Sequence, residues 1–180
     1  MYGLVNKAIE DLVKENFGIE VWQKVKTRSN ITVDFFISNE PYDDQITYQL
    51  AQAVADETQL PLSEVLISFG EYWVLKTGRQ KYGSLLEAGG STLKEFLCNL
   101  PHFHNRIMLM YTKLTPPEFK ISDVEDQSLH LHYYSKREGL QEFVRGLLQG
   151  LGKMYNTPVV IELLQSRNEQ ADHEIFKVSW

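Results

Sequence analysis

The strongest constraint on the fold of this chain is a change in hydrophobic periodicity near residues 116–117, a Pro-Pro pair. Before this pair, apolar residues recur every three to four positions, as in residues 3–15, which is the spacing of a helical face. After it, residues 129–134 alternate between the two faces of an extended chain, as in a half-buried strand. Because Pro-Pro cannot continue a helix, the chain divides here into a helical half and a sheet-forming half.

The elements expected on each side of this boundary define the fold class. Helical segments are expected at 3–15, around 21–25, from 44, at 63–73 and at 93–111. The second half reads strand, strand, helix, strand, strand, at 119–121, 129–134, 138–153, 158–164 and 174–178. That order is typical of an antiparallel sheet with a helix packed on it. We therefore expect a single α+β domain over residues 1–180, with an N-terminal helical subdomain packed on a C-terminal four-stranded antiparallel sheet.

Composition excludes several classes of partner. The net charge of −6 argues against nucleic acid, because phosphate binding needs a basic surface. The longest apolar runs are far shorter than the ~20 residues that a membrane span requires, and the first residues show no signal-peptide pattern. A single cysteine, Cys98, excludes an internal disulfide and suits a reducing compartment. We expect a cytoplasmic domain that binds neither nucleic acid nor a membrane.

One histidine lies in the apolar stripe of the helix expected at 93–111. His104 falls at helical spacing between Leu100 and Ile107, in a stripe that also contains Leu93, Leu97 and Tyr111. A buried neutral imidazole needs a partner for each ring nitrogen, since an unsatisfied buried polar group costs ~1–3 kcal/mol. His104 is therefore either a core histidine satisfied by its neighbours or a metal ligand that faces a cavity.

A second polar group follows the alternating strand. If the extended conformation persists to Arg137, then Tyr133, Ser135 and Arg137 all point to the inner side of the strand. A buried arginine needs an acidic partner, and its planar fork suits a carboxylate or phosphate. The alternatives are a binding site for an anionic group beside an apolar cavity and an internal Arg–Glu salt bridge.

Other chemistry is poorly supported. His130 and His132 share a strand face and could bind zinc with a carboxylate, but the chain has no cysteine pair and no His-Glu-x-x-His motif. Motifs for a catalytic nucleophile or a phosphate-binding loop are also absent. One inward histidine, one anion-binding group and a large apolar lining are together what a haem requires.

These residues resemble the H-NOX (haem nitric oxide/oxygen-binding) family, which includes the haem domain of the soluble guanylate cyclase beta subunit. The similarity covers essentially the whole chain, and its most specific part is Tyr-x-Ser-x-Arg at 133–137 with the preceding His104 and Pro117. Further matching segments are residues 1–6, 69–73, 99–100, 132–140 and 171–173.

The resemblance implies that haem b (iron protoporphyrin IX) lies between the two subdomains, with His104 as the iron ligand. Tyr133, Ser135 and Arg137 would hold its propionates, and Pro117 would press on the porphyrin. The remaining pocket residues implied by the family are Tyr2, Val5, Leu100, Ile107, Phe143 and Leu147.

Gas selectivity follows from the distal side of this pocket. Family members that hold dioxygen are similar in having a distal tyrosine, which donates a hydrogen bond to the partly negative bound gas. The matching positions here are Ile9, Val74 and Phe143, all apolar. We expect ferrous haem that binds nitric oxide and carbon monoxide but not dioxygen.

The resemblance also implies a non-enzymatic signalling role. Nitric oxide would break the bond between His104 and iron, and the freed helix would signal to a separate effector, such as a histidine kinase or a cyclase. No effector domain is recognisable within these 180 residues, so the output would act on another protein or on another part of a longer chain. The alternatives are a haem enzyme (a peroxidase or a nitric oxide dioxygenase) and a haem-free module that binds an anionic ligand at Arg137.

Overall fold

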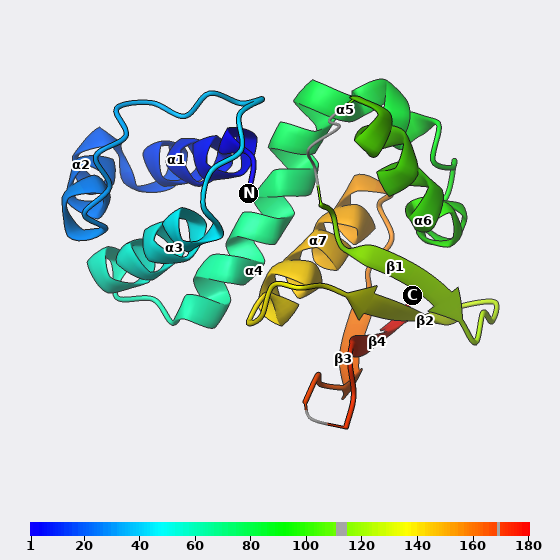
Figure 1. Cartoon of the computed structure of the whole chain (residues 1–180). Coiled ribbons are helices and arrows are strands. Elements are labelled where there is room, and N and C mark those ends of the chain that lie inside the picture. Colours follow the sequence, from blue (N-terminus) through cyan, green and yellow to red (C-terminus); the bar gives the residue numbers. More distant parts are fainter. Residues whose placement is uncertain (111–114, 169) are drawn as a thin grey trace.

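The computed structural model describes residues 1–110, 115–168 and 170–180. Tyr111, the last residue of the predicted apolar stripe, lies outside the described residues. Helices on one side and a sheet on the other make up the structure (Figure 1). The helices are α1 (Gly3–Phe17), α2 (Ile19–Arg28), α3 (Asp44–Thr58), α4 (Leu62–Tyr72), the π-helix η1 (Trp73–Gly78), α5 (Arg79–Glu87), α6 (Leu93–Met110) and α7 (Gln141–Met154). The strands are β1 (Glu118–Ser122), β2 (Ser128–Tyr134), β3 (Val160–Gln165) and β4 (Glu174–Ser179).

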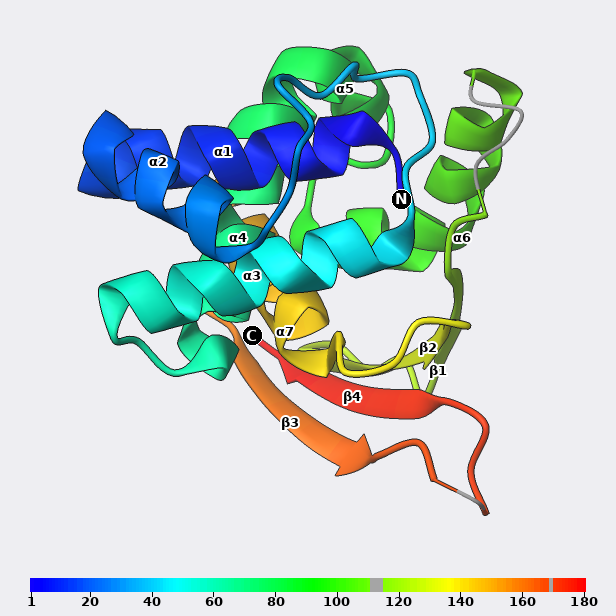
Figure 2. The same cartoon turned by 60° about the vertical axis from the view of Figure 1, so that its left-hand side comes forward.

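Helices α1, α2 and α3 pack together at one side of the molecule (Figures 1 and 2). The start of α3 is fixed by Asp43, whose carboxylate accepts a hydrogen bond from the backbone N–H of Gln45 at 2.8 Å. Apolar faces of these helices and of α4 form one core, which includes Ile9, Val13 and Leu50. The predicted helical half is therefore present, with its apolar stripes turned inward.

The sheet has the strand order β1-β2-β4-β3, and every neighbouring pair is antiparallel. Leu129, Leu131 and Tyr133 of β2 are buried on the inner face, where α7 and the first half of α6 cover them. The alternating pattern thus predicted the inner face of β2 correctly. The α+β fold expected from the sequence is confirmed.

Helices α4 and α7 cross at very close range, and glycine makes this crossing possible. A Cβ built on Gly146 would lie 2.1 Å from the carbonyl oxygen of Ile67, and one on Gly70 would lie 2.3 Å from that of Phe143. Any side chain at these positions would push the helices apart. The crossing brings α7 beside η1 and places both against the same cavity.

Of the helices described, none is long and apolar enough to span a membrane.

Candidate functional site

An apolar cavity of about 250 Å³ lies between the helical part and the sheet. It is lined by the start of α1, by η1 and α5, by α6, by β1 and β2, and by α7. Most lining side chains are aliphatic or aromatic; His104 contributes an imidazole to the lining and Arg137 contributes a guanidinium. The cavity therefore suits a largely apolar ligand that offers one atom to an imidazole and an anionic group to a guanidinium.

His104 lies on α6 one turn after Pro101 and faces this cavity. Its ring stacks on that of Phe119, with centroids 5.2 Å apart and planes 11° apart. Burial lowers the pKa of His104 to about 4, so the imidazole is neutral at pH 7. Its Nδ1 atom is buried without a hydrogen-bond partner in the described part of the chain. The structure does not show the neighbours that would make His104 a satisfied core histidine.

Arg137 also lines the cavity, but its guanidinium already has partners. Its Nε atom donates to Oδ2 of Asp44 at 2.8 Å, and Nη1 donates to the carbonyl oxygen of Thr115 at 3.0 Å. Burial raises the pKa of Asp44, but hydrogen bonds from the amino terminus of Met1 and from Arg137 outweigh it, so the pKa lies below its usual value. Asp44 therefore stays ionised and holds Arg137 at the cavity.

The strand geometry assumed for residues 133–137 is wrong in one respect. The extended conformation ends at Tyr134, because Glu118–Tyr134 is the last β1 pairing and the chain then turns. Tyr133 is buried on the inner face, and burial raises the pKa of its phenol, which remains a hydrogen-bond donor. Arg137 therefore reaches the cavity because the loop after β2 carries it there, and not because side chains alternate along an extended strand. The internal salt bridge, one of the two alternatives left open by the sequence, involves Asp44 at the start of α3 and not a glutamate.

The structure brings most predicted site residues together around the cavity. The lining contains His104, Tyr133, Arg137, Pro117, Tyr2, Val5, Leu100, Ile107, Val74, Phe143 and Leu147. Two predicted residues are not in the lining itself. Ser135 lies next to it, with a side-chain hydrogen bond to Tyr133, and it accepts a hydrogen bond from the backbone N–H of Arg137 at 3.0 Å. Ile9 is buried in the core of the N-terminal helices, one turn of α1 beyond Val5 and further from the cavity.

Sequence reasoning missed several residues around the cavity. Trp73 and Tyr82 line it, and Tyr82 packs with Leu4 and Ile107. Their position on helices was predictable, but nothing in their spacing identifies which face borders a cavity. Asp44 was assigned to a helix start and not to Arg137, because residues 93 positions apart give no local signal.

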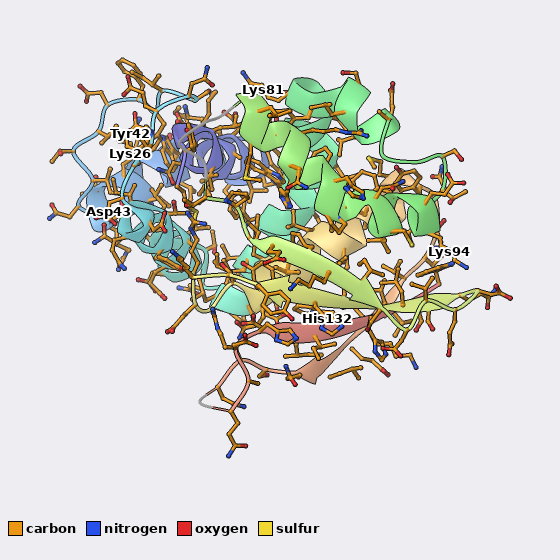
Figure 3. All side chains as sticks on the ribbon, turned by 45° about the vertical axis from the view of Figure 1, so that its right-hand side comes forward. Lys26, Tyr42, Asp43, Lys81, Lys94 and His132 are labelled. Carbon is orange, nitrogen blue, oxygen red and sulfur yellow. The ribbon has the colours of Figure 1, made fainter. Side chains whose placement is uncertain are left out.

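His130 and His132 lie on the outer face of the sheet, away from the cavity (His132 is labelled in Figure 3). The Nδ1 atom of His132 lies 2.9 Å from Nε2 of His173, and Nδ1 of His130 lies 2.9 Å from a carboxylate oxygen of Asp123. Among the residues that the structure describes, no group of three or more histidine, cysteine or acidic side chains is placed to hold a metal ion. The two histidines thus have separate partners and face solvent.

This fold and cavity define an α+β domain with an apolar ligand cavity between its helices and its sheet. A family model described as Haem-NO-binding matches residues 2–163, which is most of the chain. The chain belongs to this family, known as H-NOX.

Similar curated proteins include soluble guanylate cyclases. The chain is 29% identical over 180 residues to soluble guanylate cyclase gcy-31 of Caenorhabditis elegans, covering 99% of this chain and 26% of the relative. It is 30% identical over 123 residues to guanylate cyclase soluble subunit beta-2 of Rattus norvegicus, covering 65% of this chain and 18% of the relative. The chain thus spans about a quarter, or less, of the length of these relatives.

Solved structures with the same fold are H-NOX proteins. An H-NOX protein from S. oneidensis in the Fe(II)NO ligation state superposes with a TM-score of 0.89 at 18% identity, covering 99% of this chain and 98% of that one. An Fe(II) unliganded H-NOX protein from K. algicida gives a TM-score of 0.85 at 23% identity, covering 99% and 96%. At these identities the similarity establishes the shared fold.

Proposed function

We propose that this domain is a haem-based gas sensor that binds nitric oxide and carbon monoxide at ferrous haem b and excludes dioxygen. The observation that carries the proposal is His104, a neutral imidazole held at an apolar cavity with a buried Nδ1 atom that lacks a partner among the described residues. When bound, the haem iron supplies the site for the gas.

The residues around the cavity fit a haem. His104 offers a neutral nitrogen lone pair, which is what an axial ligand needs. Arg137 and the protonated Tyr133 phenol offer donors to propionate groups, with Ser135 holding the loop that carries Arg137. Pro117 lies in the lining, as expected for a residue that presses on the porphyrin.

The exclusion of dioxygen rests on the side chains at the positions that match the distal side. Val74 comes from η1, and Phe143, Val144 and Leu147 come from α7, and none of these four offers a hydrogen-bond donor; Trp73 of η1 also lines the cavity and carries an indole N–H, but it does not match a distal position. Bound dioxygen takes up negative charge and depends on such a donor, whereas nitric oxide and carbon monoxide need little help.

Helix α6 is the element that we propose moves during signalling. Its first half is buried on the sheet through Leu93, Phe96 and Leu97. Beyond Pro101 the helix packs along one face, through His104 and Ile107, while the other face is open and Leu109 is 82% exposed. Detachment of His104 on nitric oxide binding would therefore free the second half of α6, and an effector would read that movement.

The relatives named soluble guanylate cyclases point to a cyclase as the effector, either a separate protein or another part of a longer chain. A histidine kinase remains the other class of partner. We place the domain in the cytoplasm, as a sensor without catalysis of its own.

Absorption spectroscopy tests the proposal. The purified domain should bind one equivalent of haem, and the ferrous form should change spectrum with nitric oxide and with carbon monoxide but not in air-saturated buffer. In a His104→Gly variant supplied with free imidazole, nitric oxide should no longer alter the effector. A lasting dioxygen spectrum contradicts the selectivity, turnover of peroxide or nitric oxide favours a haem enzyme, and failure to take up haem favours a haem-free anion-binding module.

A further inference from the structure

The loop that carries Arg137 is held by a second arginine. After Tyr134 the backbone leaves the sheet, so the carbonyl oxygens of Ser135 and Arg137 have no strand partner in the described sheet. Arg167 donates to both of them, from Nη1 to Ser135 and from Nη2 to Arg137 at 2.7 Å. One guanidinium thus replaces the neighbouring strand that the loop lacks.

Arg167 is itself held by a buried carboxylate. Glu174 lies opposite Tyr133 in the register of β2 and β4 and is only 4% exposed. Its Oε1 atom lies 3.6 Å from Nη2 of Arg167, and its Oε2 atom is buried without a hydrogen-bond partner in the described residues. A buried carboxylate is costly without a cation beside it, so Glu174 keeps the guanidinium at the end of the sheet.

We propose that Arg167 and Glu174 are a positioning pair that sets the backbone of residues 135–137 and thereby aims Arg137 into the cavity. Neither residue is part of the cavity lining that the structure describes. The side chain of Arg137 is tied to Asp44, and its carbonyl oxygen is tied to Arg167, so its place at the cavity is defined from both ends. The inference rests on the proposed haem-binding function of that cavity.

Lysine cannot replace this arrangement. Two nitrogens of one planar guanidinium reach two carbonyl oxygens at the same time, whereas an ammonium group offers its donors from a single point. An Arg167→Lys variant keeps the charge beside Glu174 but loses at least one of the two bonds to the loop. The expected consequence is faster release of an anionic cofactor without general unfolding.

Arg145 provides a matched control. It has the same kinds of contact, since its Nε atom pairs with Glu142 at 3.0 Å and its Nη1 atom donates to the carbonyl oxygen of Ile161 at 2.6 Å. Its side chain is 21% exposed, against 18% for Arg167. It braces α7 against β3, away from residues 135–137. Arg145→Lys therefore measures the general cost of losing such a bond.

The experiment compares the wild type, Arg167→Lys, Glu174→Gln and Arg145→Lys. The haem-loaded proteins are mixed with excess haem-free myoglobin, and the rate of haem transfer is followed. We expect Arg167→Lys to transfer haem about tenfold faster than the wild type, the factor for one lost charge-assisted hydrogen bond. Glu174→Gln should also transfer haem faster than the wild type, and the rate for Arg145→Lys should stay within about twofold of the wild-type rate. Equal rates for the two lysine variants overturn the inference.

Hydrogen exchange separates this inference from the proposed function. In the haem-free proteins, the amides of residues 135–140 should exchange faster in Arg167→Lys than in Arg145→Lys, whether or not the cavity accepts haem. A wild type that takes up no haem refutes the proposed function. Unchanged exchange at 135–140 in Arg167→Lys refutes the positioning pair, even if haem binds.

Discussion

Replacing Gly146 with alanine tests the packing that forms one side of the cavity. A Cβ at this position would lie 2.1 Å from the carbonyl oxygen of Ile67, and ordinary contacts begin at 3.4 Å. Helices α4 and α7 must therefore separate by roughly 3.4 − 2.1 = 1.3 Å. Because the obstacle is backbone and not a flexible side chain, no rotamer change can relieve it.

The energetic cost combines two opposing effects. Alanine is more favourable than glycine inside a helix by ~0.5–1 kcal/mol, while forcing apart a close-packed contact costs ~1–3 kcal/mol or more. We expect the free energy of unfolding to fall by about 2 kcal/mol and Tm to fall by about 4–8 °C for a chain of this size. Because α7 also carries Phe143 and Leu147 to the cavity, carbon monoxide should bind the ferrous protein faster.

Thermal unfolding and flash photolysis of the carbon monoxide complex provide the measurements. Gly83→Ala in α5 is the matched control, since a Cβ there would meet no described atom within 4 Å. The Gly83→Ala variant should have the same free energy of unfolding as the wild type, or up to ~1 kcal/mol more, and it should bind carbon monoxide at an unchanged rate. If Gly146→Ala is as stable as Gly83→Ala, the close crossing of α4 and α7 is not the constraint that we infer.

Three further predictions concern single side chains. The pKa of His104 is lowered to about 4, so the unfolded chain binds that proton first and the haem-free protein loses stability as pH falls from about 6.5 to 4. At 1.36 kcal/mol per pKa unit, the free energy of unfolding falls by ~3 kcal/mol over this range. Urea unfolding of the His104→Phe variant should show no such fall. Parallel pH profiles for the wild type and the variant would contradict this prediction. Asp44→Asn should lower the free energy of unfolding at pH 7 by about 1 kcal/mol, because the variant loses the ion pair with Arg137. The difference in stability between wild type and variant should vanish once pH falls below the lowered pKa of Asp44. A difference that persists in acid would refute the ion pair. Thr92→Ala should cost ~1 kcal/mol in thermal unfolding, because Thr92 Oγ1 accepts the N–H of Glu95 at 3.2 Å at the start of α6.

Local periodicity was enough to predict most of the helices, the four strands and the inner face of β2, but it gave no helix at η1 or α5. His104 was assigned to the buried stripe of α6 and Tyr133 to the inner face of β2, and both lie there. These predictions succeed because the period of a helix or strand is a property of neighbouring residues. The family membership, too, was recognisable from short motifs.

The tertiary structure alone decided what the polar residues contact. Arg137 pairs with Asp44, and Arg167 holds the loop 135–137, because packing brings helix α3 and the segment between β3 and β4 beside the end of β2. Ile9 lies in the helical core and not at the cavity, since α1 carries it one turn too far along. Contacts between distant segments depend on how elements pack and where strands end, and a pattern of neighbouring residues records neither.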